Sequence, residues 1–309
     1  MSREVFPIVD ALWAGRLDVL VLRTEDSRLW SLNFEARSAR PIPLSSDTSW
    51  EEVRAASDEA VLMSRWRDVW AYVRIKLDDD GRCVPCGPVT PVAADTSSWR
   101  RVAWLKFPFL LVLVDRAEWG CDLYRVDVVS GSMAPFIQSD GEPVIGSRGG
   151  FLIDREKRLV ALCNGFEVPI FDLASLKQTG VIQPRIAVSS SSEATFRSED
   201  GSILRASYQG LYKSQVGAKA ATWFVEHPTL FKCALLGFSH ALQAYVLLNS
   251  EGTRTGVIRE HLPPMSWWSA EAGGVEIPSD HCAVRLNDRG DRVLLLRRNK
   301  SIEVRTLGA

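Results

Sequence analysis

The chain has 309 residues, of which 46% are hydrophobic and 24% are charged, as in an ordinary globular protein. Its 37 Lys and Arg residues are balanced by 38 Asp and Glu residues, so the net charge is −1. This balance argues against a protein that coats nucleic acid or an anionic membrane, and the apolar content excludes a largely disordered chain.

No stretch approaches the ~20 consecutive apolar residues that a membrane span needs. The first residues, MSREVFPIVDALW, lack the basic, apolar and small-residue regions of a secretory signal. We therefore expect a cytoplasmic protein with no membrane contact.

One module recurs along the chain: two short strands with alternating apolar residues, joined by a turn rich in Asp, Asn, Gly or charge. Such turns are typical of β-hairpins. The repeat period averages about 46 residues, which matches the blades of a β-propeller. The predicted hairpins cover residues 18–34, 59–75, 109–131, 158–176, 193–208, 243–259 and 291–307.

Further candidate strands flank the hairpins. Apolar stretches precede four of them, at residues 101–105, 150–153, 233–236 and 282–286. Proline-bearing stretches follow three of them, at residues 40–44, 82–87 and 134–138, and proline suits an outer strand that can spare an N–H group. The sequence therefore predicts an all-β protein. We expect one domain over residues 1–309, a single seven-bladed β-propeller of four-stranded antiparallel blades, with six or eight blades as the alternatives.

A propeller ring has to close, because open sheet edges invite unwanted pairing. The last predicted hairpin ends two residues before the end of the sequence. We therefore predict that an N-terminal strand at residues 4–8 pairs with the last blade. The alternative is that residues 6–13 form the inner strand of the first blade.

Two copies of the module, residues 151–176 and 282–307, resemble WD40-type blades. In the first of these, Phe171 and Asp172 stand where such repeats carry a Trp-Asp pair. The pair is replaced elsewhere, and the Gly-His signature is absent. The substitutes are Trp30-Ser31, Trp70-Ala71, Tyr124-Arg125 and Val304-Arg305. The chain thus resembles a divergent WD40-like β-propeller, a resemblance that implies a fold and not a particular activity.

No established catalytic or metal-binding motif occurs in the sequence. The P-loop, the G-x-S-x-G elbow and the H-E-x-x-H pattern are missing. Cys83 and Cys86 form a C-x-x-C pair, but no second pair or closely spaced histidines follow to complete a zinc site. Carboxylates such as Asp115 and Asp154 could converge at the central channel, although Asp and Glu are too frequent to assign a role. We predict no catalytic residue, no metal and no cofactor.

Bulky residues in the turns between the middle strands, and in the long loops, are the most informative feature. In a propeller we expect these turns and loops to share one face. Trp and Arg dominate the energetics of protein interfaces. The alternative is that many of the eleven tryptophans are core residues. The candidate partner-binding residues are Arg65, Trp66, Arg67, Trp119, Phe166, Trp267, Trp268 and Arg298.

These features favour a non-enzymatic scaffold or adaptor that binds a partner protein through one propeller face. The arginines would suit an acidic or phosphorylated segment, and nucleic acid is not an expected partner. The chain also resembles the propeller subunits of bacterial multi-component systems, which implies complexes with an AAA+ ATPase or a von Willebrand A protein in defence operons. The alternatives are a propeller hydrolase or lyase that uses the central channel, and a propeller that binds a small ligand or glycan.

Overall fold

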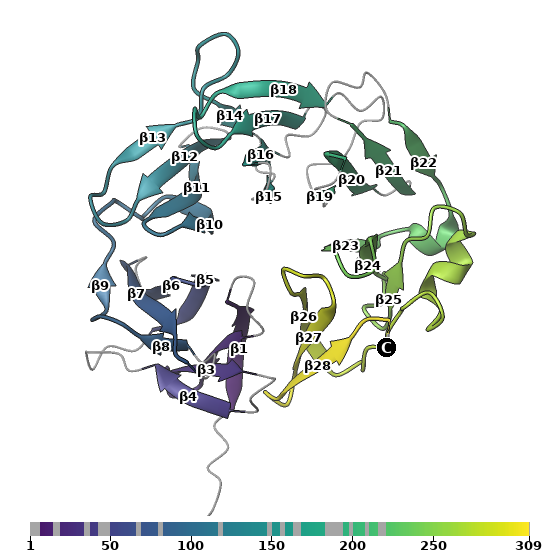
Figure 1. The fold of residues 1–309 in the computed structure, drawn as a ribbon, viewed down its shortest axis with the longest axis horizontal. Helices are drawn as coiled ribbons and strands as arrows, with labels where there is room; N and C mark the ends of the chain where they lie inside the picture. Colours follow the sequence, from purple (N-terminus) through teal and green to yellow (C-terminus); the bar gives the residue numbers. More distant parts are fainter. Residues whose placement is uncertain are drawn as a thin grey trace, which may run out of the picture.

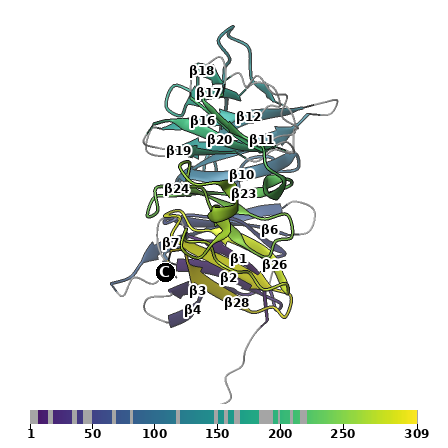
Figure 2. The same cartoon turned by 90° about the vertical axis from the view of Figure 1, so that its right-hand side faces the viewer.

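Seven antiparallel sheets follow one another in sequence order and are arranged as a ring (Figure 1). The ring is thinner from the side than it is wide (Figure 2). The computed structural model describes residues 7–14, 19–33, 38–42, 50–65, 69–79, 83–116, 120–146, 150–154, 158–162, 168–182, 194–197, 200–207, 210–215 and 221–308. Within them the predicted seven-bladed, all-β propeller is confirmed.

The first four blades each have an inner strand, two middle strands and an outer strand, and blades two and three each have one further short strand. Blade one consists of β1 (Ile8–Trp13), β2 (Val19–Thr24), β3 (Leu29–Asn33) and β4 (Ser38–Ile42). Blade two consists of β5 (Glu52–Ala56), β6 (Ala60–Arg65), β7 (Val69–Leu77), β8 (Cys83–Pro85) and β9 (Thr90–Pro91). Blade three consists of β10 (Trp99–Lys106), β11 (Phe109–Asp115), β12 (Cys121–Asp127), β13 (Met133–Pro135) and β14 (Ile145–Gly146). Blade four consists of β15 (Phe151–Asp154), β16 (Leu159–Leu162), β17 (Val168–Asp172) and β18 (Gln178–Ile182).

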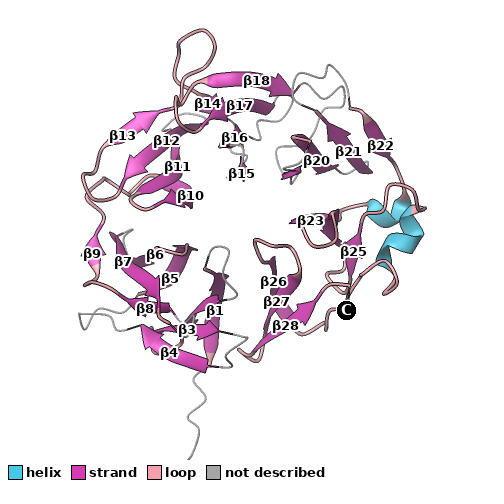
Figure 3. Ribbon diagram, in the orientation of Figure 1, coloured by secondary structure: helices cyan, strands magenta, loops and turns pink. Residues whose placement is uncertain are grey.

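In the last three blades two short 3₁₀ helices connect the sheets, one after blade five and one after blade six. Blade five consists of β19 (Ala194–Arg197), β20 (Ser202–Ser207), β21 (Gly210–Ser214) and β22 (Trp223–Val225). Blade six consists of β23 (Ala234–Ser239), β24 (Ala244–Leu248) and β25 (Thr255–Val257), and blade seven of β26 (His281–Leu286), β27 (Arg292–Arg297) and β28 (Ile302–Thr306). The helices η1 (Pro228–Leu230) and η2 (Pro264–Trp268) lie at the outer rim (Figure 3).

In blade five the predicted middle hairpin is wrong, because it is shifted by one strand toward the N-terminus. Residues 193–208 contain β19 and β20, which are the inner strand and the first middle strand, whereas the middle hairpin is β20–β21. The turn before β20 contains Gly201, whose φ is 68°. This turn has the same chemistry as the turns between the middle strands of other blades, so composition alone does not distinguish the two.

The N-terminal part of the described chain belongs to blade one. Ile8–Trp13 form β1, the inner strand, which pairs with β2, so the alternative interpretation of this segment is confirmed. The backbone N–H of Ile8 also donates to the carbonyl of Lys300 in blade seven, with an N–O distance of 2.9 Å. Residues 4–6 lie outside the described residues, so their pairing with the last blade stays a prediction.

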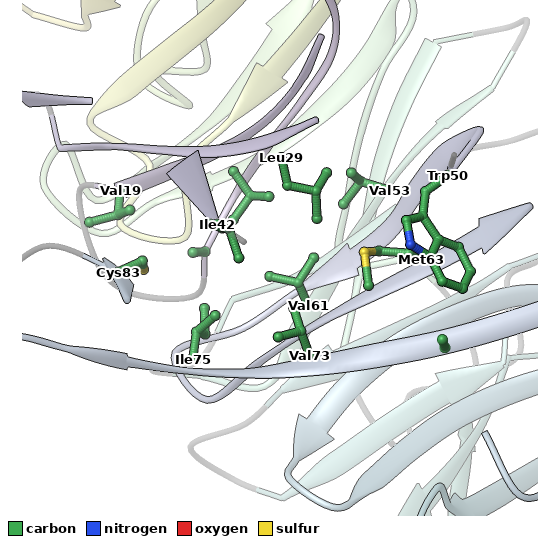
Figure 4. Packing of buried hydrophobic residues seen from close by; sticks show 13 residues of the cluster. Val19, Leu29, Ile42, Trp50, Val53, Val61, Met63, Val73, Ile75 and Cys83 are labelled. Carbon is green, nitrogen blue, oxygen red and sulfur yellow. The ribbon is translucent and has the colours of Figure 1, made fainter. Parts of the chain in front are cut away.

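The core lies between the blades. Because side chains alternate along a strand, Val19 and Val21 of β2 face blade two, whereas Leu20 and Leu22 face blade seven. On the blade-two side, the side chains of both blades form one buried cluster, which includes Leu29 of blade one and Val61 and Met63 of blade two (Figure 4). Each blade is thus held by apolar contacts on both of its faces. No helix in the described ranges is long and apolar enough to cross a membrane.

Candidate functional site

The strand connections define two faces of the ring. In every blade the turn from the inner strand to the first middle strand lies at one end, and the turn between the two middle strands lies at the other, because neighbouring strands are antiparallel. We name these the inner-turn face and the middle-turn face. The sequence predicts that most of the candidate partner-binding residues lie on the middle-turn face.

A pocket lies at the inner-turn face, where the inner strands of blades four to seven end. It has a volume of about 540 Å³ and is lined by β15, β19, β23 and β26 together with the turns that follow β23 and β26. No single blade forms it. Its position at the centre of the ring follows from the placement of four inner strands around one axis (Figure 1).

The lining of the pocket is mixed, and Phe238 of β23 is an aromatic member of its apolar part. The ring of Phe238 packs edge-on against the rings of His240 and Tyr245, at centroid distances of 5.2 and 5.1 Å. The guanidinium of Arg197 in blade five lies 5.8 Å from the centroid of the same ring. This contact ties blade five to blade six. The wall is completed by Leu152, Ile153, Phe196, Leu236 and Leu286.

The rim of the pocket is polar. Asp288 and Arg289 are exposed in the turn after β26, and His240 is exposed in the turn after β23. Asp154, at the end of β15, is only 5% exposed and reaches the pocket from the opposite blade. Thr195 adds a half-buried hydroxyl. The pocket therefore offers an apolar wall and charges of both signs.

The turn that carries Asp288 and Arg289 is held in place by two sets of contacts. The side-chain oxygen of Asn287 accepts the backbone N–H groups of Asp291 and Arg292, each at 3.0 Å. The carbonyl of Arg289 accepts the N–H of His240, so this turn is joined to blade six. The rim residues are thus presented by a fixed turn and not by a free loop.

Gly290 allows this turn to pack so closely. Its φ is 72°, a conformation that glycine adopts readily. A Cβ atom at this position would lie 2.3 Å from the Cα of Ser239 and 2.5 Å from the carbonyl oxygen of Phe238. Any other residue would push blade seven away from the pocket wall.

The middle-turn face can be assessed only in part. Arg65 ends β6, but its side chain and residues Trp66, Arg67, Trp119 and Phe166 lie outside the described structure. Arg298 is described, and it is exposed in the turn between β27 and β28 as expected. A partner site on this face therefore stays a prediction.

The two remaining candidates, Trp267 and Trp268, are located differently from the prediction. Trp267 is 1% exposed, and its indole N–H donates to the carbonyls of Arg259 and Leu262 at 2.8 and 3.1 Å. Both rings pack in the cluster between blades five and six, at the outer rim. The expectation that Trp267 is an exposed interface residue is wrong, because the ring fills the gap between these blades.

Trp268 packs against the backbone of blade six. A Cβ atom added to Gly256 in β25 would lie 2.7 Å from its ring. The absence of a side chain at Gly256 lets the ring lie on the strand. The segment after η2 then covers the edge of blade six, since the N–H of Thr255 donates to the carbonyl of Val275. The backbone around Glu276 therefore takes the place of an outer strand next to β25.

The structure does not bring together the cysteines and carboxylates that we considered from the sequence. Burial raises the pKa of Cys83 to about 12, with smaller contributions from the charges of Asp58 and Asp78, so its thiol stays protonated. Cys86 is a free, exposed thiol. Asp115 lies in blade three, where it pairs with Arg100 at 3.4 Å, far along the chain from the pocket that contains Asp154. Among the described side chains, no group of three His, Cys, Asp or Glu could hold a metal ion.

The pocket residues carried a sequence signal that we did not use. Asp154, His240 and Asp288 each follow directly, or within two residues, the apolar run of an inner strand. In a propeller these positions meet at the centre of one face. A comparison of the residues that end the inner strand in consecutive blades would have identified these three residues together.

Comparisons with known proteins agree on the fold. No protein-family model matches the sequence, and no curated protein is a detectable relative. The crystal structure of the Cps50 (Swd1) β-propeller domain from Myceliophteria thermophila is similar, with a TM-score of 0.60. The match covers 97% of this chain and 96% of that one at 9% sequence identity. At this identity the similarity establishes the fold alone. Together with the seven sheets of the described residues, the comparison shows that the chain has the fold of a seven-bladed β-propeller.

Proposed function

We propose that this protein is a non-enzymatic scaffold subunit that holds a short segment of a partner protein in the pocket at its inner-turn face. The pocket carries this proposal. Its volume lies within the range of sites that bind drug-sized ligands. It combines an aromatic wall for an apolar side chain with charged rim residues that fix orientation.

The inner strands add a further reason to favour a peptide. Within the described residues each inner strand has a ladder neighbour on one side, so alternate N–H and C=O groups on its other edge are directed toward the axis of the ring. A peptide segment can pair with such groups, as in other complexes where an extended chain aligns with a strand edge. The apolar lining of the pocket and the free backbone groups of the inner strands can both contact an extended peptide. The surface of a rigid globular partner would reach them less well.

The wider role follows from the fold. A propeller with a partner segment in its central pocket still has its rim and its middle-turn face available for other subunits. We therefore expect the chain to work in a multiprotein complex in the cytoplasm. An AAA+ ATPase or a von Willebrand A protein from the same cells is the first candidate partner to test.

The experiment compares three tagged proteins in affinity capture from the native cells, followed by reconstitution with the purified partner. Thr195→Arg fills the pocket from β19, and Arg289→Glu reverses a charge at the exposed rim. Arg298→Glu changes the middle-turn face and is the matched control. We expect both pocket variants to bind the partner at least tenfold more weakly by calorimetry, and the control to bind it normally.

Two other outcomes would contradict the proposed site or the proposed role. A partner that binds the pocket variants normally but is lost by Arg298→Glu would move the site to the middle-turn face. Turnover of a substrate that requires His240 or Asp154 would contradict the non-enzymatic role. Circular dichroism and the melting temperature confirm that each variant is folded before binding is compared.

A further inference from the structure

Two turns of blade three lie side by side at the inner-turn face. The first, residues 107–108, connects β10 and β11, and the second, residues 128–132, connects β12 and β13. The N–H of Val128 donates to the carbonyl of Pro108 at 3.1 Å, which joins the two turns. The carbonyl of Val128 accepts the N–H of Ala93, in the link from blade two, at 3.2 Å. Both turns therefore present their side chains from a fixed position.

Apolar side chains are exposed on these turns. Phe109, at the start of β11, is 37% exposed, and Val129, in the second turn, is 56% exposed. Phe109 pairs in the ladder with Asp127, two residues before Val129, so the two apolar side chains lie in the same part of the fold. Exposed apolar residues that lie together mark candidate contact surfaces.

Two arginines are stacked on the phenylalanines that flank Pro108. The guanidinium of Arg74, in β7 of blade two, lies 4.7 Å from the ring centroid of Phe107. The guanidinium of Arg125, in β12, lies 5.2 Å from the ring centroid of Phe109. Both distances are typical of cation–π contacts. A guanidinium that lies over a ring keeps the N–H groups at its edge for other acceptors, and this planar fork suits a carboxylate.

These positive charges are not paired with acids of the same chain. Among the described residues, no ion pair involves Arg74, Arg125 or Lys106, which is exposed at the end of β10. Arg125 makes one long hydrogen bond, 3.4 Å from its Nη1 to the carbonyl of Leu173 in blade four. Four of its five N–H groups are thus left for another acceptor.

The carboxylates beside these turns have other roles. Glu59 of blade two accepts the backbone N–H of Phe107 at 3.0 Å. Asp127 accepts the backbone N–H groups of Val129 and Ser130 at 2.9 and 3.2 Å. Both acids therefore fix the backbone of the turns, and the surface keeps an excess of positive charge.

We propose that this surface, formed by Arg74, Phe107, Phe109, Arg125 and Val129, binds an acidic segment of a partner protein. Carboxylates of the segment pair with the two guanidiniums, and an apolar side chain next to them packs on the exposed apolar residues. The net charge of −1 for the whole chain favours a short acidic peptide over nucleic acid, which needs a broader positive field. The surface belongs to blades two and three and the pocket to blades four to seven, so this inference does not depend on the proposed function.

The test measures binding of the full-length chain to a fluorescein-labelled peptide of three Glu-Leu repeats, by fluorescence anisotropy. We expect binding that weakens with added salt, and much weaker binding of a matched peptide of three Gln-Leu repeats. Arg74→Ser and Arg125→Ser should each raise the dissociation constant about tenfold, because each removes a charged hydrogen-bond donor. Arg254→Ser changes an exposed arginine of blade six and is the matched control, which should bind normally.

Further variants separate the surface from the fold and from the pocket. Arg74→Lys and Arg125→Lys keep the charge without the planar fork, so each should bind between the wild type and its serine variant. Thr195→Arg blocks the pocket and should leave peptide binding unchanged, whether or not the pocket holds a partner. Equal binding of the Glu and Gln peptides, or no binding by the wild type, would overturn the proposal. Normal binding by both serine variants would overturn it as well, and so would tighter binding of a short single-stranded oligonucleotide.

Discussion

At the scale of single residues, Trp267 shows that an aromatic side chain in a loop can be part of the core. Trp267 has the residue type of an interface anchor and lies in a loop, yet its ring is buried between two blades and both its acceptors belong to its own chain. Met265, two residues earlier on η2, is 62% exposed. The short helix thus presents one side to the core and the other to solvent.

We expect Trp267→Ala to lower the free energy of unfolding by about 3–5 kcal/mol, because it leaves a cavity between blades five and six and two carbonyls without their donor. Met265→Ala on the same helix should change it by less than about 0.5 kcal/mol. Urea denaturation followed by circular dichroism measures both. Equal effects of the two variants would show that Trp267 is not a core residue.

Asp172 is the last residue of β17, and it organises the turn that follows this strand. Its carboxylate accepts the N–H of Ser175 at 2.6 Å, the hydroxyl of Ser175 at 2.8 Å and the N–H of Ala174 at 3.1 Å. The Ser175 N–H is the main reason that the pKa of Asp172 is lowered below its usual value of 3.8, and burial opposes it weakly. The charged form is therefore the one that the folded state prefers.

Because the pKa of Asp172 is lower in the folded state than in the unfolded chain, its ionised carboxylate stabilises the fold. This stabilisation is fully present above the pKa of the unfolded chain, and it is lost as the pH falls through the pKa of the folded state. Asp172→Asn keeps the shape of the side chain and removes its charge. We expect it to be less stable than the wild type at pH 7, by about 1 kcal/mol or less near the surface. The difference should disappear well below pH 3.8. Urea midpoints at both pH values test this, and a constant difference would contradict it.

At the scale of elements, the hairpins could be predicted from the sequence. The contacts between side chains of different blades could not. The middle hairpins of six blades were predicted because alternation and turn chemistry are local to about fifteen residues. The error in blade five arose where two successive turns look alike. The pocket was missed because its residues come from four blades, and only the closed ring brings Asp154 near Asp288. The burial of Trp267 likewise depends on a neighbouring blade.

The contact between the blade-seven turn and blade six gives a prediction at this scale. Gly290 and Gly141 both have positive φ values, 72° and 90°, but only Gly290 has backbone atoms where a Cβ would be placed. We expect Gly141→Ala to cost about 1–2 kcal/mol from conformation alone. Gly290→Ala should cost about 1–3 kcal/mol more, since the turn must move away from Ser239.

Thermal unfolding of the two glycine variants measures the difference. Because the turn carries Asp288 and Arg289, Gly290→Ala should also weaken binding at the pocket, whereas Gly141→Ala should not. Similar melting temperatures for both variants would show that the two blades do not restrain each other at this point.

Three junctions of the ring are reinforced by arginines of inner strands that reach the next blade. Arg101 of blade three lies 5.6 Å from the ring of Phe151 in blade four, and Arg197 links blades five and six through Phe238. The last such contact joins the end of the chain to its beginning. Arg285 of blade seven donates to the carbonyl of Ala11 in blade one and lies 3.3 Å from the carboxylate of Asp10. Closure of the ring therefore combines polar contacts with the apolar cluster between these blades.

We expect Arg285→Ala to loosen the junction between blades seven and one without unfolding the ring. The loss should be about 1–2 kcal/mol, because a charged hydrogen bond to a backbone carbonyl is removed while the partly exposed ion pair with Asp10 contributes little. Amide hydrogen exchange should become faster in β1 and β26 and stay unchanged in β11 and β16, on the other side of the ring. Arg254→Ala, which removes an exposed pair with Glu276 inside blade six, is the matched control and should leave β1 as protected as in the wild type. If β1 exchanges at the wild-type rate in Arg285→Ala, the apolar cluster alone closes the ring.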